Sequence, residues 1–183
     1  IWHQSEALAR EQVARIKPGQ YEAEALFDSD GVDLDTAVPL KVKVEVAGSE
    51  MVIDFSEISE QVRGSINSGE SGAVAAARVA FKSLVAPYSP IDEGCFRPLK
   101  IIIPKGKILS ATAPAPVGNW SRTLPTVIDL ILKALASAMP DRVAAGHKGD
   151  MGGYAFFGTD PKTGRRFLCQ TIMGGGWGGR AHE

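Results

Sequence analysis

The stretch GNWSRTLPTVIDLILKALASAMP, residues 118–140, carries the strongest helix signal of the chain. Pro125 suits the first helical position, where a missing N–H costs nothing, and Pro140 ends the run. Between them, apolar residues recur at spacings of three and four, as in a helix with one buried face: Val127, Ile128, Ile131, Leu132, Leu135 and Met139. We therefore predict a core helix that starts at Pro125.

The loop before this helix is rich in hydrogen-bonding groups: Gly118, Asn119, Ser121 and Arg122. Helix N-termini attract anions through free N–H groups and the helix dipole. An arginine here could hold a carboxylate or phosphate through two parallel hydrogen bonds. Alternatively, Asn119 and Ser121 make turn and capping bonds only. The loop is thus a candidate site without a named reaction.

The rest of the chain predicts an α+β fold, with antiparallel β-hairpins packed against two or three helices. Residues 40–46 alternate between apolar and charged side chains, and residues 51–55 alternate again after Gly48. This pattern is typical of an antiparallel hairpin with one wet face. Further segments are predicted as helices (2–16 and 73–85) and as strands (20–27, 99–103, 154–157 and 166–172).

Composition excludes several functional classes. The chain has 183 residues, 44% apolar and 22% charged, and no apolar run reaches the ~20 residues of a membrane helix. The sequence contains neither a basic run nor zinc-finger spacing, so we do not expect it to bind nucleic acid. Residues 1–60 hold 13 acidic and 5 basic side chains, whereas residues 61–183 hold 8 and 15, so the second region is basic. Cys95 and Cys169 lie far apart, which favours buried thiols in a reducing cytoplasm.

Two further loops carry candidate chemistry. His147 and Asp150 lie in AAGHKGDMGG, residues 144–153, and could form a base with its orienting carboxylate, a metal pair, or loop structure only. Gly174, Gly175 and Gly176 open a glycine-rich segment. A dinucleotide fingerprint would need a helix there and an acid ~20 residues later, so a tight turn against backbone or ligand is favoured.

The acidic turn around Asp30 is a weaker candidate. Asp28, Asp30, Asp33 and Asp35 could suggest calcium, but they lack the spacing and the terminal glutamate of an EF-hand loop. We therefore expect a solvated turn.

Several motifs in order resemble the hydantoinase B/oxoprolinase family. They are GQYEAE (19–24), IDFSEISEQVRG (53–64), Asn67, DEGCFRP (92–98), Gly118-Asn119, AMPDR (138–142) and TIMGGGWGG (171–179). The resemblance covers essentially the whole chain. It implies a middle fragment of a larger multi-domain subunit, with residues 1–60 as a helix plus an acidic hairpin region. Residues 61–183 would be a basic α+β region with the Asn119 loop and the glycine-rich turn.

The resemblance further implies a B-type subunit of an ATP-dependent hydrolase that opens cyclic amides such as hydantoins, 5-oxoproline or lactams. Relatives carboxylate acetone or acetophenone, and an inert scaffold that only docks other subunits is a third possibility. ATP with Mg would be bound mainly by an A-type partner in a cytoplasmic hetero-oligomer. A divalent metal is implied for the full-length subunit, with its ligands outside these residues, and the isolated fragment would be inactive.

The site residues follow from the resemblance and from local chemistry together. Asn119 and the glycine-rich turn are carried over from the family, while Arg122, His147 and Asp150 are chosen for their chemistry. Gly118 and Ser121 are assigned to substrate binding. The chain departs from common members after Gly118-Asn119, where it reads Trp120-Ser121-Arg122, and at Gln170, where a glutamate is frequent. These departures leave the substrate open.

Overall fold

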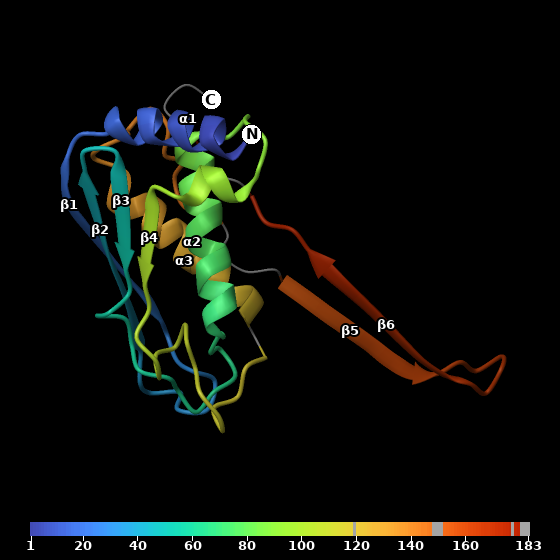
Figure 1. Ribbon diagram of the computed structural model, residues 1–183. Coiled ribbons are helices and arrows are strands. Elements are labelled where there is room, and N and C mark those ends of the chain that lie inside the picture. Colours follow the sequence, from blue (N-terminus) through green and yellow to red (C-terminus); the bar gives the residue numbers. More distant parts are fainter. Residues whose placement is uncertain (119, 148–151, 177, 180–183) are drawn as a thin grey trace.

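A computed structural model describes residues 1–118, 120–147, 152–176 and 178–179. Helices and strands are interleaved along the chain (Figure 1). The helices are α1 (Trp2–Ala14), α2 (Glu70–Val85), the short 3-10 helix η1 (Glu93–Phe96) and α3 (Trp120–Leu135). The strands are β1 (Gly19–Phe27), β2 (Val38–Ala47), β3 (Glu50–Asp54), β4 (Leu99–Ile102), β5 (Gly152–Thr159) and β6 (Arg166–Met173). The predicted α+β class is confirmed.

The main sheet has the order β1-β2-β3-β4. β2 is antiparallel to both β1 and β3, with Val44 opposite Tyr21 on one side and Ile53 on the other. The pairing of β4, which was predicted only as a strand, is parallel: it runs alongside β3 with Ile101 opposite Ile53. Parallel neighbours require a long crossover, and α2 lies within the connection between these two strands.

The predicted alternation in β2 is confirmed. Leu40, Val42, Val44 and Val46 are buried, whereas the side chains between them are at least partly exposed. Lys41 on the wet face pairs with Glu22, Glu24 and Glu57 at 3.2, 3.5 and 3.0 Å, and Lys43 also pairs with Glu57. One face of the sheet is therefore apolar core and the other a ladder of paired charges.

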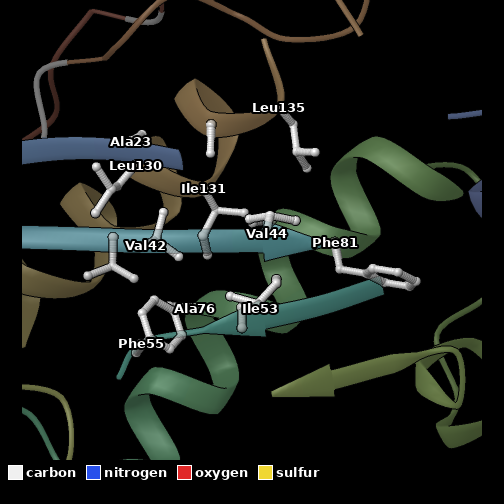
Figure 2. Packing of buried hydrophobic residues seen from close by; sticks show 14 of the residues in the cluster. Ala23, Val42, Val44, Ile53, Phe55, Ala76, Phe81, Leu130, Ile131 and Leu135 are labelled. Carbon is white, nitrogen blue, oxygen red and sulfur yellow. The ribbon is translucent and has the colours of Figure 1, made fainter. Parts of the chain in front are cut away.

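Helices α2 and α3 cover the apolar face (Figure 2). Ile131 and Leu135 of α3 and Phe81 of α2 belong to the same buried cluster as Val44 and Ile53 of the sheet. The buried face of α2 is built largely of small residues, which allows a close approach to its neighbours: Ala73, Ala76, Ala77 and Ala80. Core packing thus fixes the position of α3 relative to the sheet.

The start of α3 differs from the expectation. The helix begins at Trp120, so Pro125 lies inside it rather than at its first position. Proline cannot donate to the carbonyl of residue 121, which is a cost that tertiary contacts must offset. Thr123 supplies one such contact, because its fully buried hydroxyl donates to the Ile66 carbonyl at 2.5 Å.

Strands β5 and β6 form a separate two-stranded sheet, called the arm below. Their hairpin confirms the predicted strand pair and extends it, with Phe157 opposite Leu168. Figure 1 shows the arm projecting away from the main sheet and the helices. Among the described residues, no helix combines the length and apolar character needed to cross a lipid bilayer.

Candidate functional site

The start of α3 is tied to residues 62–68. The Gly118 N–H donates to the Ser65 carbonyl at 2.9 Å, and Val117 pairs with Ile66 in an antiparallel bridge. A Cβ at Gly118 would lie 3.3 Å from the Ser65 Cβ. Gly118, predicted to bind substrate, therefore also packs against this loop. Its neighbour Asn119 lies outside the described residues.

The buried side-chain amide of Asn67 holds this arrangement together. Asn67 is fully buried, and its Oδ1 accepts from the Val62 N–H at 2.8 Å. Its Nδ2 lies 2.8, 2.9 and 2.9 Å from the carbonyls of Val62, Gly64 and Pro116. One side chain thus joins residues 62–64 to the segment that enters α3. Sequence reasoning noted Asn67 only as part of a motif, because its most distant partner is 49 residues away.

Asp30 supports the same loop through the backbone of Gly64. Its carboxylate accepts from the N–H groups of Val32 (2.8 Å), Asp33 (2.7 Å) and Gly64 (2.8 Å). These hydrogen bonds, that from Asp33 foremost, hold the pKa of Asp30 below its ordinary value despite some desolvation. The expectation of a solvated turn is wrong for this residue, which is buried, whereas Asp28, Asp33 and Asp35 are at least partly exposed.

Polar residues of α3 form a stripe on its outward side. Arg122 is exposed, and the Thr126 hydroxyl donates to its carbonyl at 2.9 Å. Asp129 follows seven residues after Arg122, which is about two turns and roughly 10 Å along the same side of the helix. Ser121 is half-buried in the first turn rather than in the loop before it. The predicted anion-binding arginine is therefore on the helix itself.

His147 contacts the far end of this stripe. Its backbone N–H donates to Asp129 Oδ2 at 3.1 Å, and its Nε2 lies 3.4 Å from Asp129 Oδ1. About a quarter of each side chain's surface remains exposed, so the pair is partly shielded yet open to a ligand. Sequence reasoning paired His147 with Asp150, which lies outside the described residues. Asp129 was missed, although it is the only charged residue in the apolar run 125–132.

The glycine-rich segment returns to this loop. The Ala145 N–H donates to the Gly179 carbonyl at 2.9 Å, and a Cβ at Gly178 would lie only 1.6 Å from the Ala145 carbonyl oxygen. A close approach of backbone to backbone therefore occurs in this segment, at Gly178 rather than at the glycines singled out from the sequence. Gly174, Gly175 and Gly176 are exposed, and a Cβ at Gly174 or Gly176 would meet nothing within 4 Å.

The candidate site is therefore the outward side of α3 from Arg122 to Asp129, together with His147 and the adjoining Gly178. A hollow of about 420 Å³ lies elsewhere, between α1, the end of α2 and Arg142. The Asp129–His147 pair is the candidate for chemistry, because the described lining of that hollow contains no histidine–carboxylate pairing. Within the described ranges, no three His, Cys, Asp or Glu side chains are grouped to hold a metal ion.

Comparison with known proteins gives consistent results. The family model described as hydantoinase B/oxoprolinase matches residues 1–183. The B-type component of a putative D-/L-hydantoinase from Pseudomonas sp. (strain NS671) is 31% identical over 98% of this chain and 32% of that protein.

Two solved structures share the fold. An ATP-dependent caprolactamase from Pseudomonas jessenii has a TM-score of 0.79 and 23% identity, over 91% of this chain and 29% of its own. A nucleotide-free acetone carboxylase also has a TM-score of 0.79, at 16% identity, over 99% of this chain and 26% of its own. The chain thus spans about a third or less of the length of these proteins.

Proposed function

The chain belongs to the hydantoinase B/oxoprolinase family, and from this premise we propose that it forms part of the B-type subunit of an ATP-dependent hydrolase. The reaction is the opening of a cyclic amide of the hydantoin, 5-oxoproline or lactam type. Two relatives support this reading by their names, one a hydantoinase component and the other a caprolactamase. The observation in the structure that carries it is the Asp129–His147 pair at one end of a polar stripe that begins at Arg122.

The chemistry suits these residues. Once the amide oxygen is phosphorylated, water adds to the amide carbon and the carbon–nitrogen bond breaks as the ring nitrogen takes up a proton. A second water then hydrolyses the resulting acyl phosphate to the carboxylate and inorganic phosphate. A histidine next to a carboxylate is suited to moving such a proton. An arginine can balance the charge of a phosphorylated intermediate. The separation of roughly 10 Å along α3 between Arg122 and Asp129 leaves room for a small ring with its phosphoryl group.

The remaining proposed site residues complete this assignment. Asn119 and Asp150 are proposed as catalytic residues, and both lie outside the described part of the chain. Gly118 and Ser121 would contact the substrate near the start of α3, with Gly174, Gly175 and Gly176 on the opposite side. Removal of the Ser121 hydroxyl should raise KM more than it lowers kcat if this role is correct.

ATP and Mg are assigned to a partner. The described residues do not build a nucleotide cradle: Gly174 and Gly176 have open space around them, and the strand before them is antiparallel to β5. We therefore propose that ATP with Mg is held by an A-type subunit and that residues of this chain act on the activated amide. The divalent metal implied for the whole protein likewise finds no ligand group among the described residues.

A cytoplasmic location is proposed for the same enzyme. Cys95 and Cys169 are both free thiols. The expectation that both are buried is wrong for Cys169, which is exposed on the arm. An exposed free thiol on a strand suits a reducing compartment, where it stays reduced.

Carboxylation of a ketone is the second candidate function, and it is favoured by the likeness to acetone carboxylase over 99% of the chain. The decisive experiment measures phosphate release from ATP by the natural polypeptide that carries these residues, co-expressed with its A-type partner. Release driven by hydantoins, 5-oxoproline or lactams without bicarbonate supports the hydrolase. Release only with a ketone and bicarbonate overturns it in favour of the carboxylase. Release with neither substrate class favours an inert scaffold.

A further inference from the structure

Pro125 divides α3 into a first turn, residues 120–124, and a longer second part. A proline has no N–H, so the Ser121 carbonyl loses its helical donor at this point. The ladder of backbone hydrogen bonds that fixes one turn on the next is therefore weakened between Arg122 and Asp129. Contacts outside the helix must contribute to the direction in which the first turn presents Arg122.

Residues 62–68, called the clamp below, hold this first turn. The hydroxyl of Thr123 is fully buried and donates to the Ile66 carbonyl at 2.5 Å. Ile66 also pairs with Val117 in an antiparallel bridge just before the turn. A threonine hydroxyl inside a helix commonly bonds a carbonyl of its own preceding turn. A partner 57 residues away in sequence is instead a tertiary contact, which ties the turn to the clamp.

The clamp is itself fixed to the body of the protein. The Ser68 N–H donates to the Ile108 carbonyl at 2.7 Å, and the Ala111 N–H donates to the Ser68 carbonyl at 3.1 Å. Both Ser68 and Ile108 are buried. A Cβ at Gly64 would lie 1.7 Å from the Asp30 carbonyl oxygen, so the backbone is in close contact there as well. A support held at several points can set the position of the element that it contacts.

The bond made by Thr123 determines which way the first turn faces. Successive side chains of an α-helix are separated by roughly 100° about its axis. With Thr123 directed at the clamp, its neighbour Arg122 lies on the exposed side, in line with Asp129 two turns further along. Rotation of the first turn by a single residue would move Arg122 out of line with Asp129 and His147.

We propose that Thr123 is a positioning residue of the candidate site, which aims Arg122 at the phosphoryl group of the activated substrate through its bond to the clamp. The inference rests on the proposed function, because it takes Arg122 as the residue that balances the charge of the phosphorylated amide. Thr123 is buried, so it acts through Arg122 rather than on the substrate itself.

The role has a measurable consequence because a phosphorylated amide can react with water in two ways. Attack on the amide carbon leads to ring opening. Attack on phosphorus breaks the phosphorus–oxygen bond instead and returns the intact cyclic amide together with inorganic phosphate. An Arg122 that is aimed correctly holds the phosphoryl group so that the amide carbon lies at the Asp129–His147 pair. A misdirected Arg122 therefore lets ATP be consumed without ring opening.

The test measures phosphate released from ATP per amide ring opened, in variants of the natural polypeptide co-expressed with its A-type partner. Thr123→Val keeps the shape of the side chain and removes the hydroxyl, whereas Thr123→Ser keeps the hydroxyl. We expect Thr123→Val to slow ring opening roughly tenfold and to raise the ratio of phosphate to opened amide at least about twofold. Thr123→Ser should keep both values near those of the wild type.

Two controls separate the aiming of Arg122 from a general loss of stability. Ile53→Val removes one buried methyl group from β3, outside the clamp. Thr112→Val makes the same chemical change at an exposed position, where the hydroxyl bonds Gln61 at 3.2 Å. Both controls should keep the wild-type ratio. An unchanged ratio for Thr123→Val, or an equal rise for Ile53→Val, would overturn the inference.

Hydrogen exchange separates this inference from the proposed function. Thr123→Val should speed exchange at the amides of Gly118 and Leu124, while residues 127–135 stay as protected as in the wild type. Wild-type exchange at Gly118 and Leu124 in this variant would overturn the inference whatever the reaction is. If no cyclic amide drives turnover by the wild type, the proposed function fails and the substrate role of Thr123 fails with it. Faster exchange at the two amides would then still support its hold on the first turn.

Discussion

Asp129 holds His147 at two points, since one carboxylate oxygen accepts from the backbone N–H at 3.1 Å and the other lies 3.4 Å from Nε2. The contact joins the middle of α3 to the loop that leads into the arm. It thereby fixes both the path of the backbone and the direction of the imidazole.

Loss of this carboxylate should lower activity without unfolding the protein. We expect Asp129→Ala to reduce kcat roughly 10- to 100-fold, because a general acid or base that is badly oriented loses most of its effect. Asp129→Asn keeps an acceptor for the His147 N–H, so its kcat should lie between those of the wild type and Asp129→Ala. Steady-state kinetics with the co-expressed partner would check this. A large effect of His147→Ala alongside wild-type kinetics for Asp129→Ala would contradict the positioning role.

The close approach of Gly178 to Ala145 predicts that substitution by alanine disturbs the structure at Gly178 but not at Gly176. Gly178→Ala would place a Cβ 1.6 Å from the Ala145 carbonyl oxygen, so the loop that carries His147 must move. Gly176→Ala is the matched control, because its Cβ would meet nothing within 4 Å. We expect faster amide hydrogen exchange at residues 145–147 for the first variant only. Equal exchange in the two variants would refute the contact.

Asn67 should matter for stability more than any exposed amide. Asn67→Ala leaves buried backbone groups of the 62–64 and 116 segments without partners, and each such group costs about 1–3 kcal/mol. We expect a loss of roughly 3 kcal/mol in the free energy of unfolding. Gln61→Ala is the control, since Gln61 makes its bonds to Thr112 at an exposed position and should cost under about 1 kcal/mol. Urea denaturation of each variant measures both values.

The buried turn at Asp30 predicts a loss of stability in acid. Its pKa is lower in the folded protein than the unfolded value of about 3.9, so its contribution is fully present above that pH. The contribution disappears as pH falls through the lower, folded pKa. The melting temperature of the wild type should therefore drop more steeply below about pH 4 than that of Asp30→Asn.

The control for this prediction lies in the same turn. Asp28 is at least partly exposed, and Asp28→Asn leaves Asp30 and its three N–H donors intact. This variant should keep the steep acid dependence of the wild type. Parallel melting curves for the wild type and Asp30→Asn across this pH range would show that Asp30 makes no such contribution.

The elements of this protein follow from local patterns in its sequence. The strict alternation of residues 40–46 allows only one face of β2 to be buried, and the spacing of Val127, Ile131 and Leu135 does the same for α3. The hairpin loop at residues 160–165 joins two strands whichever surface they later meet. These features depend on side-chain period and turn chemistry within a few residues, which a single sequence contains.

Only the tertiary structure decided how distant segments meet. The parallel β4 joins β3 after a crossover that contains α2, and the first turns of α3 are tied to residues 62–68 by the Thr123 bond to Ile66. Likewise, Asn67 reaches Pro116 across 49 residues, and Asp129 reaches His147 across 18. Such contacts leave no periodic signal, because their partners are brought together by packing of the whole core rather than by neighbours along the chain.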